Sequence, residues 1–164
     1  FLMRLPEEFL ALELDDLIAK NVQVKVMGDV EALPSFTRKA MEEAVFRTEN
    51  NTGLILNFAL NYGARKEMED CMRAMGEDIQ AGRLSPEQIT ADFIDSRLLS
   101  SGLPDPDLLI RTSGEMRLSN FMLWQLAYSE LWFTDVLWPE FNKEHLLEAV
   151  AEYQRRSRRY GGLK

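Results

Sequence analysis

The fold class follows from residues 51–60, which read Asn51-Thr52-Gly53-Leu54-Ile55-Leu56-Asn57-Phe58-Ala59-Leu60. Turn residues lead into a near-continuous apolar run, which is typical of a strand covered on both faces. Upstream, Val22, Val24 and Val26 alternate with polar residues, and this run stops at Gly28-Asp29. The alternation predicts a second strand that is half-buried.

Further elements follow from hydrophobic periodicity and cap signals. We expect strands over residues 107–111, with Leu108, Leu109 and Ile110 buried, and over residues 131–134. Helices are predicted over residues 6–20, 35–50, 64–81, 119–128 and 143–159, with a short helix opening at Ser85. Strands that alternate with helices imply βαβ units. The prediction is therefore a single α/β domain over residues 1–164, built on a parallel β-sheet with helices on both faces.

Composition excludes several classes of protein. The chain has 164 residues with 27 acidic and 19 basic side chains, a net charge of −8, which disfavours a general nucleic-acid binder. Cys71 and His145 are each the only residue of their type, so an internal disulfide and a multi-histidine metal site are excluded. The lone cysteine is typical of a reducing, cytoplasmic location. No run reaches the roughly 18 apolar residues of a transmembrane segment.

A candidate anion site follows the strand at 107–111. Arg111 stands at the end of that strand, Gly114 marks a turn, and Arg117 and Ser119 precede a predicted helix. Guanidinium forks and the free N–H groups of a helix N-terminus suit phosphate or diphosphate. An alternative stays open at this point: the arginines could be surface ion-pair partners, and Ser119 a simple helix cap.

The surrounding sequence closely resembles the C-terminal signature of the cis-prenyltransferases, and most closely that of the bacterial undecaprenyl diphosphate synthases. The resemblance runs from Asp107 to Pro139 and departs chiefly at Ser113, where the family usually has glycine. It extends to Gly28-Asp29, to residues 52–65 with Asn61-Tyr62-Gly63, and to Arg159-Tyr160-Gly161. Serine keeps the loop small, but it disfavours a positive φ, should the loop need one there.

The resemblance implies condensation of isopentenyl diphosphate with an allylic substrate, farnesyl diphosphate, to give undecaprenyl diphosphate, a lipid-carrier precursor for the cell wall. It implies an isopentenyl diphosphate site formed by Arg111, Arg117, Ser119 and the Leu118 backbone N–H. It also implies that Glu130 is a Mg²⁺ ligand, since Mg²⁺ commonly takes one or two carboxylates beside phosphate and water.

The resemblance further implies a butterfly-like homodimer in which Arg159 and Gly161 cross the interface and complete the neighbouring diphosphate site. A product tunnel would be lined by Val22, Leu54 and Leu56, although apolar strand residues are more often plain core. Any membrane contact would be peripheral and made through the product.

The family's N-terminal motif, whose aspartate is its catalytic and Mg²⁺-binding group, has no counterpart here, and the chain opens Phe1-Leu2-Met3. We therefore expect a C-terminal part that lacks an N-terminal strand-helix portion and is inactive alone, so no catalytic residue is assigned. Two other functions stay open. One is a non-catalytic subunit of a heteromeric prenyltransferase, and the other is an unrelated phosphate-binding α/β enzyme.

Overall fold

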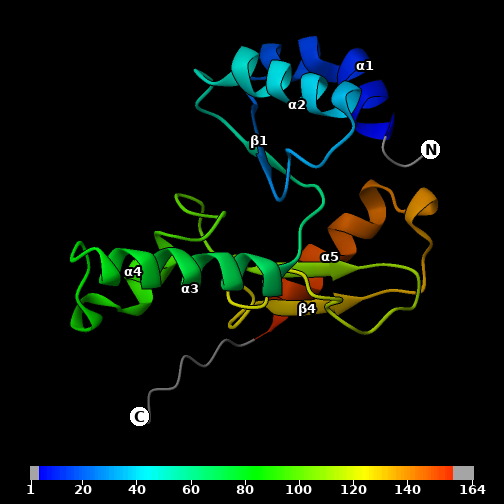
Figure 1. The fold of residues 1–164 in the computed structure, drawn as a ribbon. Helices are drawn as coiled ribbons and strands as arrows, with labels where there is room; N and C mark the ends of the chain where they lie inside the picture. The colour runs from blue at the N-terminus through cyan, green and yellow to red at the C-terminus, as the bar shows by residue number, and fades with distance from the viewer. Residues whose placement is uncertain (1–3, 157–164) are drawn as a thin grey trace. The chain divides into compact units, whose positions relative to one another are not determined.

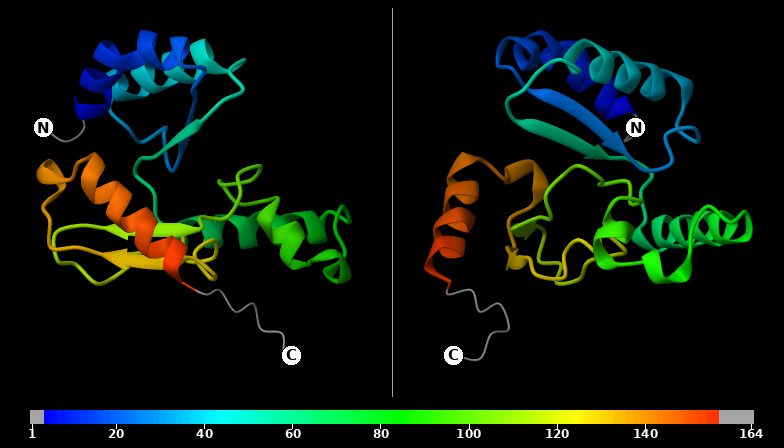
Figure 2. Two further views of the ribbon diagram at one scale, coloured as in Figure 1. Left: turned by 180° about the vertical axis from the view of Figure 1, so that it is seen from behind. Right: turned by 90° about the vertical axis from the view of Figure 1, so that its left-hand side faces the viewer.

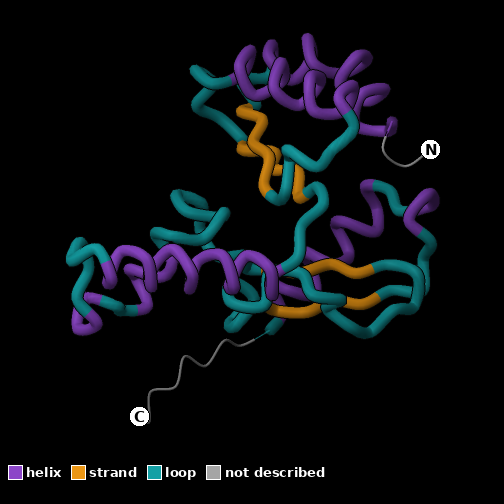
Figure 3. The backbone as a smooth tube through the Cα atoms, viewed as in Figure 1, coloured by secondary structure: helices purple, strands orange, loops and turns teal. Residues whose placement is uncertain are grey.

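A computed structural model describes residues 4–156 of the chain, and these form two compact units that meet in sequence between Gly102 and Leu103 (Figure 1). Within each unit the two strands pair in parallel. Each unit combines its strands with helices (Figure 3). The predicted α/β class is therefore confirmed. The single sheet is not found among the described residues, because the strands form two separate two-stranded pairs.

In the first unit, β1 (Gln23–Met27) pairs with β2 (Ile55–Ala59). The helices α1 (Leu5–Ala19) and α2 (Ser35–Thr48) lie side by side over these strands (Figure 2). The side chains buried between helices and strands form the core of the unit: Leu10, Leu14, Val24, Met41 and Ala44. Burial of each large apolar side chain contributes roughly 1.5 to 3 kcal/mol.

The N-terminal end of β2 is more exposed than predicted. Leu54, just before β2, is 71% exposed and Ile55 is 38% exposed, so this strand is not covered on both faces. The helices of the first unit pack against residues such as Val24 and Phe58, further along the strands. An apolar run alone does not show how far the covering helices extend.

The rest of the first unit comprises α3 (Ala64–Gln80), a 3₁₀ turn η2 (Pro86–Gln88) and the short α4 (Ala91–Asp95). Glu67, Cys71 and Met75 recur every fourth residue on the buried face of α3. Asp78 of α3 forms ion pairs with Arg83 and Arg97 at 2.7 and 3.0 Å. Cys71 is buried, as expected, and desolvation raises the pKa of its thiol.

The second unit contains β3 (Leu108–Arg111), β4 (Glu130–Phe133), the 3₁₀ turn η3 (Trp138–Glu140) and α5 (Lys143–Arg155). Leu108, Leu109 and Ile110 are half-buried rather than buried. His145 has the structural role expected of it, because its Nδ1 accepts a hydrogen bond from Asn142 N and so helps to cap α5. The predicted extension of this helix to 159 lies partly outside the described residues.

The helix predicted over residues 119–128 is wrong. Ser119, Asn120 and Met122 have φ angles of 49, 63 and 45°, in the left-handed region that a right-handed helix cannot contain. The segment instead forms a series of turns, closed by bonds such as Phe121 N to Leu118 O at 3.1 Å. Its apolar spacing reflects burial of side chains such as Leu126, not helical geometry.

Thr48 joins α2 to β1 through a buried hydroxyl. Its Oγ1 donates to Ala44 O in α2 at 2.7 Å and accepts from Val24 N at 2.9 Å. The side chain is fully buried, so water cannot replace either partner. A single hydroxyl therefore satisfies a backbone N–H that would otherwise be buried without a partner.

We expect Thr48→Val to lower the free energy of unfolding by about 1 to 3 kcal/mol, because the isosteric valine leaves Val24 N without an acceptor. Urea denaturation followed by circular dichroism measures the change. Thr48→Ser is the matched control, since it retains the hydroxyl and removes only a methyl group. Equal loss in both variants would show that the methyl group, not the hydrogen bond, carries the effect.

Candidate functional site

Arg111 lies at the carboxyl edge of the β3–β4 pair, and the backbone ladder continues beyond it. Thr134 N donates to Arg111 O at 3.0 Å, and Gly114 N donates to Thr134 O at 2.9 Å. Ser113 N extends the series by donating to Val136 O at 2.8 Å. These bonds fix the loop after β3 and hold Arg111 where ligands of parallel sheets bind.

Two consecutive residues of this loop have a positive φ: 67° at Ser113 and 68° at Gly114. A Cβ atom at Gly114 would lie 3.0 Å from Asp135 Oδ1, a tight contact that a small shift of the Asp135 side chain would relieve, so the positive φ is the main reason for glycine there. Ser113 occupies the same region of backbone conformation with a side chain, which is strained for an L-residue. The loop therefore does need positive φ where this chain has serine.

A pocket of about 240 Å³ runs along β3 and brings together three of the four residues predicted to bind diphosphate, Arg111, Arg117 and Leu118. Ser119 is not part of its lining, and its φ of 49° shows that no helix begins there. The rest of the lining is apolar: Pro106, Leu108, Leu109, Ile110, Phe121 and Leu126. The pocket thus pairs cationic groups with an apolar wall.

The two arginines differ in their surroundings. Arg117 is 63% exposed and forms an ion pair with Glu115. Arg111 is half-buried, and within residues 4–156 its guanidinium has no ion-pair or hydrogen-bond partner. Since partial desolvation strengthens electrostatic attraction, Arg111 is the stronger candidate for an anion contact. Without a helix N-terminus, the guanidinium groups supply the attraction to an anion.

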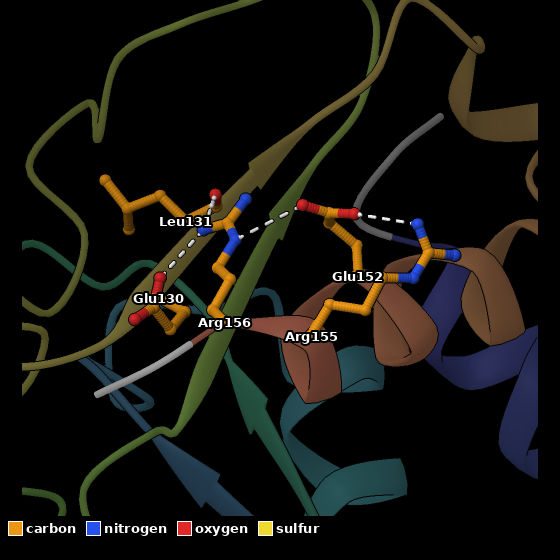
Figure 4. A network of polar contacts seen from close by, with 5 residues as sticks. All are labelled: Glu130, Leu131, Glu152, Arg155 and Arg156. Carbon is orange, nitrogen blue, oxygen red and sulfur yellow. Dashed lines mark hydrogen bonds and ion pairs between the residues drawn. The ribbon is translucent and has the colours of Figure 1, made fainter.

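Glu130, the predicted metal ligand, is bonded to the arginine that follows α5 as its C-cap residue (Figure 4). Arg156 Nη1 lies 2.8 Å from Glu130 Oε2 and 3.0 Å from Leu131 O, and both groups are partly buried, with side chains 26% and 31% exposed for Glu130 and Arg156. The hydrogen bond with Glu130 raises the pKa of Arg156. Sequence reasoning missed this pair; the arginine-rich end of the last helix was its only signal.

Glu130 and Arg111 lie at opposite ends of the strand pair. In the parallel register Glu130 stands beside Leu108, and Phe133 stands beside Arg111. Three residues of strand separate the two positions, about 10 Å at roughly 3.3 Å per residue. The structure therefore brings Arg111, Arg117 and Leu118 together, but it does not bring Glu130 into the same pocket.

Glu130 can supply one carboxylate ligand to a Mg²⁺ ion, but it does not form a complete metal site by itself. Among residues 4–156 no group of three or more Asp, Glu, His or Cys side chains could hold a metal ion. Mg²⁺ sites that use one or two carboxylates together with phosphate and water need no such cluster. Glu130 is compatible with that kind of site, with one of its oxygens, Oε2, bonded to Arg156.

A second pocket, of about 210 Å³, lies at the carboxyl edge of β1 and β2 and includes Gly28, Asp29 and Asn61. Gly28 has φ 117°, and a Cβ there would lie 1.9 Å from Leu60 O, so only glycine permits this close approach. Nearby, the buried Glu67 accepts hydrogen bonds from Tyr62 Oη at 2.6 Å and from Leu99 N at 2.7 Å. Glu67 was not singled out in the sequence, because nothing in its spacing marks it as buried.

The predicted tunnel residues occupy the opposite edge of the first unit. Val22 is buried just before β1, Leu54 is exposed just before β2, and Leu56 is half-buried opposite Val24. All three lie outside the linings of the two pockets described above. Arg159 and Gly161 lie outside the described residues.

The strand pairs and the pocket along β3 describe a parallel α/β protein with a candidate site that is both cationic and apolar. Comparison with known proteins then identifies its family: the chain belongs to the family described as putative undecaprenyl diphosphate synthase, whose model matches residues 1–161. No helix within the described part of the chain is long and apolar enough to cross a membrane.

Three relatives illustrate the match. The chain is 61% identical to an isoprenyl transferase from Geobacillus kaustophilus over 99% of its own length, and it spans 63% of that relative. Its structure resembles lavandulyl diphosphate synthase from Lavandula x intermedia, crystallised with dimethylallyl diphosphate, at a TM-score of 0.95 and 36% identity, with coverage of 99% of this chain and 70% of that one. It also resembles a probable undecaprenyl diphosphate synthase from Campylobacter jejuni, at a TM-score of 0.77 and 28% identity, covering 95% and 71%.

We expect Ser113→Gly to raise the free energy of unfolding by about 0.5 to 1 kcal/mol, because glycine adopts φ 67° without the penalty that a Cβ imposes. Thermal or urea denaturation measures the gain. Ser113→Ala keeps the Cβ and removes the hydroxyl, so it should bring no stabilisation. A gain as large in alanine as in glycine would show that the hydroxyl, not the backbone angle, is the source.

Proposed function

We propose that this chain is part of a cis-prenyltransferase that adds isopentenyl diphosphate to an allylic diphosphate such as farnesyl diphosphate, giving undecaprenyl diphosphate. The observation that carries the proposal is the pocket after β3, which joins two guanidinium groups to an apolar wall. A substrate with a diphosphate head and a short hydrocarbon tail matches both parts of such a lining. One relative was crystallised with dimethylallyl diphosphate, a molecule of the same build.

In this proposal Arg111 and Arg117 bind the diphosphate of isopentenyl diphosphate. Guanidinium forks match phosphate oxygens in pairs and keep their charge throughout the pH range of the enzyme. The Leu118 N–H and the Ser119 hydroxyl assist from the neighbouring turns. Arg117 exchanges its surface pair with Glu115 for the ligand, whereas Arg111 already stands without a carboxylate partner in the described chain.

Glu130 would supply one carboxylate to a Mg²⁺ ion. The ion, when bound, would stabilise negative charge on a departing diphosphate, which is the electrostatic help that such a condensation needs. Because Glu130 and Arg111 lie at opposite ends of the strand pair, we assign to Glu130 only the holding of the ion.

The remaining assignments complete the proposal. Arg159 and Gly161 would cross a homodimer interface to a neighbouring diphosphate site, and Val22, Leu54 and Leu56 would line the path of the growing chain. The enzyme would work in the cytoplasm and touch the membrane only through its product.

A non-catalytic partner subunit is the second candidate function. Retention of Arg111, Arg117, Ser119 and Glu130 together favours the enzyme over that candidate. An unrelated phosphate-binding enzyme would have no use for the apolar wall beside the arginines.

Replacing the arginines tests the anion site. We expect Arg111→Ala to weaken isopentenyl diphosphate binding by at least tenfold, because a charge-assisted bond contributes about 1.5 to 3 kcal/mol. Arg117→Ala should cost less, since that side chain is more exposed. Isothermal titration with isopentenyl diphosphate measures both, and Arg73→Ala, on the surface of α3, is the control. Unchanged affinity in the Arg111 variant would contradict the assignment.

The apolar wall is tested by Phe121→Ala. We expect this variant to bind isopentenyl diphosphate several-fold more weakly while binding inorganic diphosphate as before, because it loses only contact with the hydrocarbon tail. Titration with both ligands separates the two effects. Parallel losses for both ligands would favour the unrelated phosphate-binding function.

A further inference from the structure

Arg156 donates hydrogen bonds to the Glu130 side chain and to the backbone of β4, the strand that contains Glu130. A single nitrogen atom makes both bonds. Arg156 Nη1 donates to Glu130 Oε2 at 2.8 Å and to Leu131 O at 3.0 Å (Figure 4). Arg156 is the C-cap residue of α5, so these two bonds fasten the end of that helix to the start of β4. One of the two oxygens of the Glu130 carboxylate, Oε2, is therefore already bonded to a protein cation.

The bond to Leu131 has a geometric cause. Glu130 N donates to Asp107 O and Thr134 N donates to Arg111 O, so the even-numbered residues of β4 direct their backbone groups toward β3. Leu131, between them, directs its carbonyl away from β3, to the edge of β4 that no other strand of residues 4–156 occupies. Arg156 thus satisfies a backbone acceptor that its own strand pairing leaves open.

A second acceptor lies within reach of the same guanidinium. Glu152, one helical turn earlier, has its Oε1 3.7 Å from Arg156 Nε, and its Oε2 lies 3.4 Å from Arg155 Nη1. The two glutamates and two arginines form one continuous network (Figure 4). Arg156 can therefore leave Glu130 for a closer pair with Glu152, without losing contact with a carboxylate.

We propose that Arg156 is a positioning residue that holds the Glu130 carboxylate while no divalent cation is present and moves to Glu152 when one binds. This inference rests on the proposed role of Glu130 as a metal ligand. Two cations bound to one carboxylate repel each other, so Arg156 and the metal ion compete for Glu130. Arg156 consequently lowers cation affinity, and cation binding loosens the α5 terminus from β4.

The test compares Arg156→Gln with Arg155→Gln in the same protein. Arg155 is the matched control, because its one ion pair within residues 4–156 is with Glu152 and its side chain is 74% exposed. Mn²⁺ serves as the probe, and the electron paramagnetic resonance signal of free Mn²⁺ gives the dissociation constant. We expect Arg156→Gln to tighten Mn²⁺ binding by roughly two- to fivefold, the range of a partly exposed ion pair. Arg155→Gln should leave it unchanged.

A second measurement follows the contact between Arg156 and β4 directly. Hydrogen exchange at the backbone amides of residues 153–156 should speed up when Mg²⁺ is added to the unaltered protein, because Arg156 leaves β4. In Arg156→Gln these amides should exchange rapidly with or without Mg²⁺. This measurement needs no enzymatic turnover.

The outcomes separate the inference from the proposed function. If Glu130→Gln weakens Mn²⁺ binding but Arg156→Gln does not tighten it, the metal role of Glu130 stands and the competition by Arg156 is overturned. If Glu130→Gln binds Mn²⁺ as tightly as the unaltered protein, the metal role fails, and the inference falls with it. If Mn²⁺ binding tightens in Arg156→Gln but not in Arg155→Gln, and the amides at the end of α5 exchange faster, the result supports both the metal role of Glu130 and the competition by Arg156.

Discussion

The parallel pairing of β3 with β4 is the constraint on which the candidate site depends. Its ladder runs from Glu130 N at one end to Gly114 N beyond the other, so the loop that follows β3 is built onto the sheet. The register sets Arg111 at one end of the pair and Glu130 at the opposite end. The candidate anion pocket and the carboxylate that we propose as a metal ligand are thereby fixed on one strand pair, yet kept about 10 Å apart.

At the carboxyl edges of both strand pairs the chain turns through residues with a positive φ angle. After β1, Gly28 lets the backbone approach Leu60 more closely than any side chain would permit. After β3, Ser113 and Gly114 turn the chain through two left-handed residues in succession. In each unit the backbone is bent sharply where a strand ends, and a pocket lies beside the bend.

The helices of the chain could be predicted from sequence to within one or two residues where periodicity and caps agreed, as in α1, α2 and α3. The segment 119–128 could not, because its apolar spacing is compatible with a helix while its φ angles are not. Arg111 and Arg117 were singled out from their place at the end of a strand, and the structure places both in the lining of one pocket. The pair of Glu130 with Arg156 was not, because 26 residues separate them and only the packing of α5 brings them together.

The contact between Arg156 and Leu131 has a consequence for self-association. An open strand edge is a template on which a strand of another molecule can add, and natural proteins block such edges with charged side chains. The guanidinium of Arg156 donates to the Leu131 carbonyl on the edge of β4 that no strand of the described residues occupies. A strand of another molecule that paired there would have to displace a charged group that makes two hydrogen bonds. The arginine that holds Glu130 therefore also disfavours aggregation through this edge.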